Sequence, residues 1–242
     1  MQCVGLTDRG RSRGSNQDAF EAAALSDTAG FAVVCDGMGG AKGGQVASRM
    51  AVKLLAARLR EGWREDITLA SLRNILESAL ATANVKISVR AAADSRLEGM
   101  GTTVVAAVIC GNEALVAHMG DSRAYRVSKK GCEPLTRDHS IVQDLVESGQ
   151  LTAEQAQTHP RRHFITRALG ADEEAQGDFD EYTLAPGDRL LLCTDGLTNM
   201  LDLSVLHALA WSAPVNEVPK KLIDAANEAG GADNITAVVL TI

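Results

Sequence analysis

The chain has 242 residues, of which 45% are hydrophobic and 23% charged, and its formal net charge is −7. A chain of this length can bury the core of one large domain or of two small ones. The acidic balance, without a block of Lys and Arg, gives no electrostatic footprint for nucleic acid or an anionic membrane surface. We therefore expect neither nucleic acid nor a membrane among its partners.

The cysteines and the N-terminus indicate the compartment. The five cysteines form no CxxC pair, and their odd number predicts free thiols in place of disulfides or a zinc site. Free thiols suit a reducing cytosol. Because the N-terminus lacks the apolar segment of a signal peptide and no long apolar run follows it, the sequence predicts a cytoplasmic protein.

The first half of the chain predicts one strand followed by two helices. The apolar run 31–35 is typical of a buried strand, which we expect to end at Asp36. Apolar residues spaced by three and four then predict a helix over 45–59 and a longer helix within 67–93. The glycines of 37–44 are expected to precede the first helix.

The apolar period then changes to that of strands. The β-branched run 102–110 and residues 113–120 flank the turn signal Gly111-Asn112, which predicts a hairpin, and a further strand closes at Gly131. The later predicted elements are a strand over 188–196, helices over 201–211 and 215–229, and a strand over 234–242.

Residues 138–176 interrupt this pattern, because they are polar and contain Pro160. We expect short helices in a mobile segment that forms a flap over a site, with an ordinary connecting region as the alternative. The chain shows neither a repeat nor a linker, so we expect one domain over residues 1–242. Hairpins and paired helices predict an α+β fold in which helical layers cover antiparallel sheet.

Four aspartates lie at the rims of apolar strands: Asp36, Asp121, Asp195 and Asp233. A carboxylate in such a place is costly to desolvate unless it is paired or bound to metal, and few Lys or Arg residues lie beside these four. Taken singly, each is explained equally well as a helix cap or a turn residue. Taken together, they predict a shared cation.

The ligand types indicate which cation. Oxygen ligands without nearby His or Cys favour Mg²⁺ or Mn²⁺ over zinc, and the sequence does not separate the two ions. Four acids exceed the needs of one such ion, so we expect two ions, the usual arrangement for hydrolysing phosphate esters. The segment GGAKGG does not form a nucleotide-binding P-loop, since no hydroxyl residue follows Lys42.

A phosphate group also needs cationic partners. Arg9, Arg11 and Arg13 stand near Asp18 in the N-terminal segment, and the planar Arg side chain suits phosphate oxygens. A solvated basic segment is the alternative.

Seven short motifs together carry a family resemblance. They are RGSNQDA at 13–19, VVCDGMGG at 33–40, GTT at 101–103, GDSR at 120–123, TRALG at 166–170, CTDG at 193–196 and ADNITAVV at 232–239. In this order they resemble the metal-dependent Ser/Thr protein phosphatases of type 2C, the PPM family, in their compact bacterial form. The resemblance implies an αββα sandwich, in which pairs of helices flank two central antiparallel β-sheets.

The resemblance also implies an activity. A metal-activated water would hydrolyse phosphoserine and phosphothreonine on proteins, in signalling that opposes a bacterial Ser/Thr kinase, and the enzyme would be a monomer. The alternatives are a phosphatase-like binding module without turnover and a phosphoesterase that acts on a small molecule.

Metal ligands can be assigned by position from the same resemblance. Asp36 would bridge both ions, the Gly37 carbonyl would bind one of them, and Asp195 and Asp233 would complete the shell of the second. Asp121 matches the acid that holds a third, weaker ion together with Asp195 in bacterial members.

Other matched positions would support the site. Arg13 matches the residue that binds phosphate, and Asp18 and Gln17 would orient metal-bound waters. Asn234 is expected to support its loop. Met38 stands where some members have a His that serves as proton donor, which leaves the donor unassigned between a metal-bound water and another group such as His139 or His163.

Overall fold

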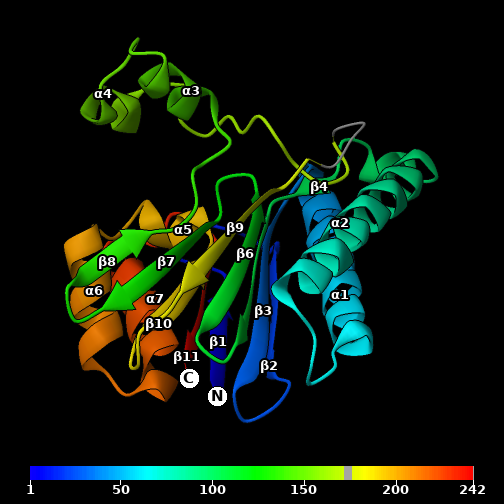
Figure 1. The fold of residues 1–242 in the computed structure, drawn as a ribbon. Helices are drawn as coiled ribbons and strands as arrows, with labels where there is room; N and C mark the ends of the chain where they lie inside the picture. The colour runs from blue at the N-terminus through cyan, green and yellow to red at the C-terminus, as the bar shows by residue number, and fades with distance from the viewer. Residues whose placement is uncertain (172–175, 242) are drawn as a thin grey trace.

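The computed structural model describes residues 1–171 and 176–241, and the strands form two antiparallel sheets packed face to face (Figure 1). The strand order of the first sheet is β1-β11-β10-β7-β8. Its strands are β1 (Gln2–Asp8), β7 (Arg123–Ser128), β8 (Gly131–Pro134), β10 (Arg189–Cys193) and β11 (Ile235–Thr241).

The second sheet has the order β2-β3-β5-β6-β9, and the short strand β4 also pairs with β3. Its strands are β2 (Asp18–Ala24), β3 (Ala29–Met38), β4 (Gly101–Thr102), β5 (Val104–Cys110), β6 (Glu113–Met119) and β9 (Asp178–Thr183). The predicted hairpin is present as β5 and β6, joined at Gly111 and Asn112.

Helices cover the outer face of each sheet. The long helices α1 (Gly40–Gly62) and α2 (Leu69–Ala92) pack on the second sheet, whereas α6 (Leu203–Ser212) and α7 (Val218–Glu228) pack on the first (Figure 1). The predicted αββα sandwich is therefore confirmed. The short elements are α5 (Asp195–Thr198) and the 3₁₀ turns Ser95–Leu97 and Val215–Glu217.

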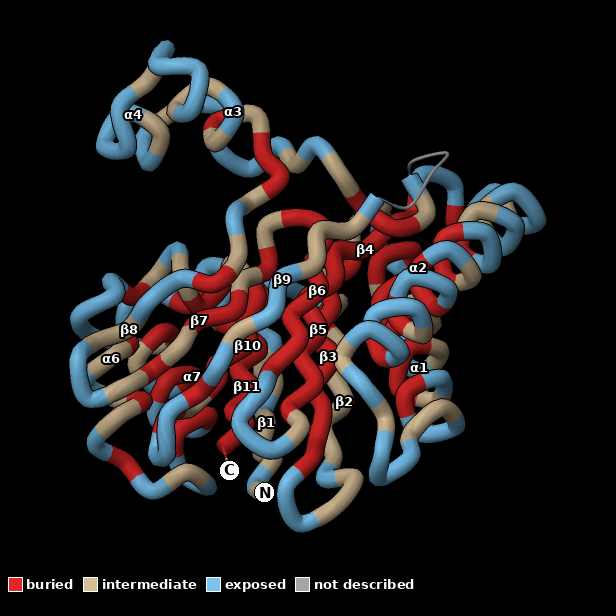
Figure 2. Tube along the Cα trace, viewed as in Figure 1, coloured by how far each residue is buried: buried red, intermediate tan, exposed pale blue. Residues whose placement is uncertain are grey.

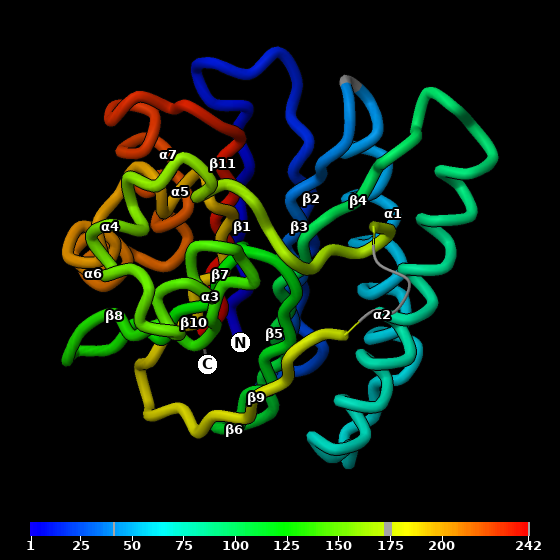
Figure 3. Tube along the Cα trace, turned by 90° about the horizontal axis from the view of Figure 1, so that it is seen from above, coloured from blue at the N-terminus to red at the C-terminus, as the bar shows by residue number. Residues whose placement is uncertain are grey.

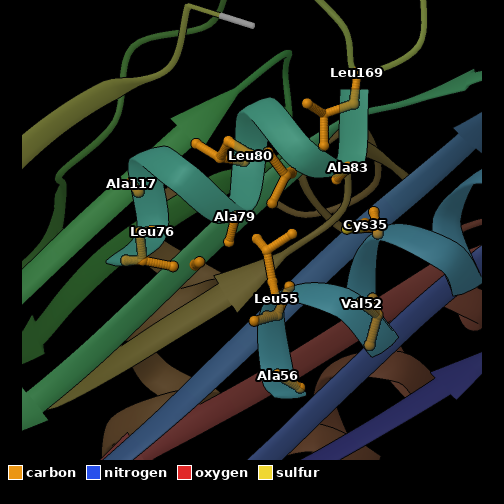
Figure 4. Close-up of a cluster of buried hydrophobic side chains, with 14 of the residues drawn as sticks. Cys35, Val52, Leu55, Ala56, Leu76, Ala79, Leu80, Ala83, Ala117 and Leu169 are labelled. Atoms are coloured by element: carbon orange, nitrogen blue, oxygen red, sulfur yellow. The ribbon is translucent and has the colours of Figure 1, made fainter. Parts of the chain in front are cut away.

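Three apolar layers result from this stacking. One lies between α1, α2 and the second sheet, where Leu55 and Leu80 pack toward Cys35 (Figure 4). A second lies between the two sheets, and a third lies under α6 and α7. Small side chains such as Ala79 and Ala117 bring helix and sheet close together, which suits a chain with only 3% aromatic residues.

Two predictions around the glycine segment are wrong. The strand does not end at Asp36, because β3 continues to Met38, and the helix starts at Gly40 and not at Gln45. Gly44 therefore lies in the first turns of α1, directly against the backbone of Gly37. A Cβ on Gly44 would lie 2.4 Å from the Gly37 carbonyl oxygen, so the glycine permits this close approach.

Four strands have no counterpart among the predicted elements: β1, β2, β8 and β9. All four are edge strands: β9 has a mostly polar sequence, β8 has only 4 residues, and β1 and β2 are only half-buried. The alternating signal of a strand is weak under these conditions.

The segment between β8 and β9 carries two short helices, α3 (Ile141–Glu147) and α4 (Ala153–Thr158), as predicted. They stand away from the sandwich and are mostly exposed (Figure 2). Seen from above, they lie over the half of the molecule that contains β7, β10 and α6 (Figure 3). The end of the predicted flap, residues 172–175, lies outside the described residues. No helix in the described part of the chain is long and apolar enough to cross a bilayer.

The contact between α1 and β3 gives a stability prediction. In Gly44→Ala, the added methyl group meets backbone that cannot move away cheaply, so we expect a loss of about 1–3 kcal/mol in the free energy of unfolding. Urea denaturation measures it. Gly14→Ala is the matched control, because a Cβ there would meet no atom within 4 Å. Equal unfolding midpoints for the two variants would contradict the proposed close packing.

Candidate functional site

The four predicted aspartates meet at one end of the sandwich. Asp36 in β3 and Asp121 after β6 come from the second sheet, while Asp195 at the start of α5 and Asp233 before β11 come from the first. All four line one cleft of about 1750 Å³, together with Arg13 and Gly37. The site therefore forms only when the two sheets pack together.

Hydroxyl groups fix the backbone that carries the second sheet's acids. The Asp36 amide donates to Thr103 Oγ1 at 3.0 Å, and the Thr103 amide donates to the Asp36 carbonyl at 2.9 Å. Thr103 Oγ1 also lies 2.7 Å from Ser122 Oγ, next to Asp121. This chain of bonds links the two acidic segments.

Asp18 lies behind the cleft at the start of β2, opposite Asp36 in the strand register. Its Oδ2 accepts hydrogen bonds from Thr236 Oγ1 at 2.6 Å and Thr194 Oγ1 at 2.9 Å. Its Oδ1 is buried without a hydrogen-bond partner among the described residues. Burial raises the pKa of Asp18 to about 7, against the opposing effect of the two hydroxyl bonds.

The acids raise one another's pKa because they share a buried space. Burial, then the charges of Asp18 and Asp195, raises the pKa of Asp36 well above its ordinary value. Burial and the charge of Asp195 raise the pKa of Asp121 to about 8. Burial and Asp233 raise that of Asp195, whose Oδ1 has no partner within the described chain. These carboxyls cannot all be ionised stably without a cation.

The donor set fits hard divalent ions. Every candidate ligand is an oxygen, and orphaned carboxylate oxygens are present at Asp18 and Asp195. Neighbouring glycines keep the site compact: a Cβ on Gly196 would lie 1.9 Å from the Asn234 carbonyl oxygen. Asp36, Gly37, Asp195, Asp233 and Asp121 could therefore hold Mg²⁺ or Mn²⁺.

Arg13 reaches across the mouth of the cleft. Its guanidinium Nη2 donates to Asp233 Oδ2 at 2.5 Å, and this bond raises the pKa of Arg13. The side chain remains 56% exposed, so an incoming anion can reach it. Arg13 thus neutralises an acid of the cluster in this form.

Gln17 and Asn234 take structural positions beside the cluster. The Asn234 amide group donates to the carbonyls of Arg9 and Ser15, and its Oδ1 accepts from the Gln17 amide, as expected for a residue that supports its loop. Gln17 Nε2 donates to the Gly40 carbonyl at 2.9 Å while its side chain lines the cleft.

The two histidines considered as proton donors lie in different places. His163 lines the cleft, where it partly opposes the upward shift that burial and Asp233 cause in the pKa of Asp195. His139 is buried, does not line the cleft, and has both ring nitrogens in contacts with protein atoms. Met38 lines the cleft as well and offers no proton.

Several supporting residues were missed by the sequence analysis. Thr103, Thr194 and Thr236 each sit within a quoted motif, the last two beside or near an acid, and that position is the signal that could have identified them. Arg123 and Asp138 form a bidentate ion pair at 2.7 and 2.6 Å, but their distance in sequence gave no signal.

Comparison with known proteins identifies the class. A sequence profile of the family described as Protein phosphatase 2C matches residues 8–234. The serine/threonine phosphatase stp of Listeria innocua is 37% identical over 238 residues, which cover 97% of this chain and 93% of that protein. The chain belongs to the protein phosphatase 2C family, which confirms the resemblance seen in its motifs.

Solved structures agree with this assignment. The serine/threonine phosphatase of S. agalactiae has a TM-score of 0.92 at 34% identity, covering 100% of this chain and 99% of that one. The catalytic domain of the phosphatase PstP, solved with two manganese ions, has a TM-score of 0.85 at 32% identity, with coverage of 98% and 96%.

The raised pKa values predict how pH affects the metal-free protein. A carboxyl whose pKa is higher in the folded than in the unfolded chain takes up a proton on folding, so its stabilising effect is lost as pH rises through the folded-state value. The window runs from the ordinary 3.8 to about 7 for Asp18 and about 8 for Asp121. We expect the EDTA-treated protein to melt at a higher temperature near about pH 6 than near about pH 8.5.

Differential scanning calorimetry measures this difference, and Asp121→Asn is the matched variant. It removes one titrating group, so its melting temperature should change less between the two pH values. A melting temperature of the EDTA-treated protein that rises with pH across this window would contradict the buried, uncompensated acids.

Proposed function

We propose that this chain is a metal-dependent serine/threonine protein phosphatase that hydrolyses phosphoserine and phosphothreonine on proteins. The observation that carries the proposal is the cluster of four aspartates from two sheets that line one cleft, with carboxylate oxygens of Asp18 and Asp195 that have no partner in the described chain and an exposed Arg13 at the edge. We further propose that residues 1–242 form one catalytic domain, active as a monomer in the cytoplasm.

In this proposal different residues of the cluster bind the ions and the substrate. Asp36 and the Gly37 carbonyl would hold a pair of Mn²⁺ or Mg²⁺ ions with Asp195 and Asp233, and Asp121 would share a third, weaker ion with Asp195. When bound, such ions supply Lewis acidity that lowers the pKa of a water and neutralises phosphoryl oxygens. Asp18 lies behind these ligands and would accept hydrogen bonds from metal-bound waters.

Arg13 has two successive partners in this account. In the metal-free form it bonds Asp233, and once ions and substrate are bound its planar fork would bind two phosphoryl oxygens. When Arg13 leaves Asp233, this carboxylate would be free to bind a divalent ion. The charge of the ion would then replace that of the guanidinium.

The dimensions of the cleft favour a protein substrate over a small molecule. Its volume of about 1750 Å³ exceeds the roughly 300–1,000 Å³ of ordinary small-molecule pockets. One wall belongs to the flap, through residues such as Val142, Val146 and Arg162. An extended phosphopeptide would fill this space between flap and sandwich. A bacterial Ser/Thr kinase and its targets are the proposed source of substrates.

Turnover should depend on the clustered acids. We expect Asp195→Asn to lower kcat/KM on a phosphothreonine peptide with Mn²⁺ by more than about 100-fold, because even indirect partners of a metal cost ~10–100-fold in affinity or activity when removed. Initial-rate assays measure the loss, and EDTA should abolish wild-type activity.

Asp224→Asn is the control for that experiment, since Asp224 is an exposed acid on α7 whose partner is Lys220. It should retain wild-type rates. Equal activity of Asp195→Asn and the wild type, or full activity in EDTA, would refute the proposed site.

Two variants separate the bidentate hydrogen bonding of the Arg13 guanidinium from the effect of its positive charge. We expect Arg13→Ala to lower kcat/KM by about 10²–10³-fold, as for the loss of one donor to transition-state charge. Arg13→Lys should recover only part, because it keeps the charge but not the bidentate fork. Steady-state kinetics measure both variants, with the exposed Arg49→Ala as control. Full activity of Arg13→Lys would show that the fork is not needed.

A further inference from the structure

His139 is a buried side chain that the proposed function does not use, yet all of its polar atoms are engaged. Its backbone amide donates to the Gly120 carbonyl at 2.9 Å, and its carbonyl accepts from the Thr166 amide at 2.8 Å. Its ring Nδ1 accepts from the Gly120 amide at 3.2 Å, and its Nε2 lies 3.1 Å from Asp178 Oδ2. One residue thus joins the turn before Asp121, the flap and β9.

These bonds define the protonation of the ring. Because Nδ1 accepts the Gly120 N–H, the proton of the neutral ring resides on Nε2 and is donated to Asp178. Burial lowers the pKa of His139 and so favours the neutral ring, although the bond to Asp178 acts in the opposite direction. Arg167 Nη1 lies 3.2 Å from Nε2, but it donates to Asp178 Oδ1 at 2.9 Å, so Asp178 accepts from both donors.

A metal site is the competing interpretation of this cluster, since ligand atoms of His118, His139 and Asp178 lie within 4.8 Å of one another. Each of these atoms already has a protein partner: His118 Nε2 donates to the Arg137 carbonyl at 2.6 Å, and Arg167 supplies the positive charge beside Asp178. The cluster is therefore a closed hydrogen-bond network. The two imidazole rings stack at 4.5 Å, which fixes the plane of His139.

The segment that enters the flap after β8 runs antiparallel to the segment that carries Asp121. The Ala124 amide donates to Thr136 Oγ1 at 3.0 Å, and Arg123 forms its two bonds to Asp138. The bonds between His139 and Gly120 are the last of this series. They are also the nearest to Asp121.

The segment that leaves the flap is hydrogen-bonded at the same point. Ser140 and Ile165 form a β-bridge next to the bond between His139 and Thr166. Farther along, Leu169 exchanges backbone bonds with Thr102 at 2.9 and 3.0 Å. Displacement of the flap would therefore act on Gly120 through His139 before it acts on other parts of the cleft.

We propose that His139 is a positioning residue that holds the Gly120–Asp121 turn through its Nδ1 atom and couples the flap to the weaker metal position at Asp121. The inference rests on the proposed function, because it assigns a regulatory contact to that site. Coupling of this kind is reciprocal: metal at Asp121 stabilises the flap, and an ordered flap raises the affinity for that metal.

Two substitutions separate the two ring nitrogens. Asn places an acceptor at the level of Nδ1, whereas Gln places a donor at the level of Nε2. We expect His139→Asn to keep the affinity of the weaker Mn²⁺ site near that of the wild type, and His139→Gln to weaken it by about 10–100-fold. Calorimetric titration of EDTA-treated protein with Mn²⁺ measures affinity without turnover. Of these two variants, only His139→Gln should show fast hydrogen exchange of the Gly120 amide.

A variant outside the core tests the same inference even if the two His139 variants fail to fold. Asp178 is half-exposed on β9, and Asp178→Ala removes the acceptor that fixes the ring. It should speed exchange of the Gly120 amide and of the flap amides 140–166, whereas the exposed Asp180→Ala on the same strand should not.

The outcomes separate this inference from the function on which it rests. Equal Mn²⁺ affinities in His139→Asn and His139→Gln, or unchanged exchange in Asp178→Ala, would overturn the coupling while leaving a working phosphatase. A wild-type protein that binds no Mn²⁺ would overturn both. Loss of Mn²⁺ affinity in Gln alone, with faster exchange at Gly120, supports the role of Nδ1.

Discussion

The desolvation of clustered carboxylates, together with their mutual repulsion, is the constraint on which the rest of this structure depends. Asp36, Asp121 and Asp195 have raised pKa values because each is buried near other acids, and two carboxylate oxygens in the described chain lack any partner. A folded chain keeps ionised carboxylates in such a cluster only when cationic groups compensate their charge. In this form Arg13 supplies part of it through Asp233, and divalent ions would supply the rest.

The sandwich is what makes this cluster possible. Each sheet contributes two acids at the same end, so neither half of the chain has a site by itself. Close backbone contacts then set the spacing: Gly44 of α1 against Gly37, and Gly196 against Asn234. His139 connects this site to the flap, because its hydrogen bonds join the turn before Asp121 to the segments that enter and leave the flap.

Much of this was predictable from the sequence, for physical reasons. Apolar strands with an acid at the end and paired apolar helices have strong periodic signals, so Asp36, Asp195 and an antiparallel sheet covered by helical layers were predicted from the residues, whereas the αββα sandwich was implied by the family resemblance. The start of α1 was not, because glycine disfavours helix and only its packing on Gly37 explains its presence there. The edge strand β9 is polar, and the contacts of His139 join residues 19 and 39 positions apart, which no local pattern encodes.

The central claim is that the aspartate cluster holds a pair of divalent ions which Arg13 partly replaces in their absence. Anomalous diffraction from crystals grown with Mn²⁺ tests it most directly. The account predicts two strong peaks about 3.5–4 Å apart, flanked by Asp36, Asp195 and Asp233, with Arg13 released from Asp233. Saturating Mn²⁺ without peaks at this cluster, and with the Arg13–Asp233 pair intact, would contradict it.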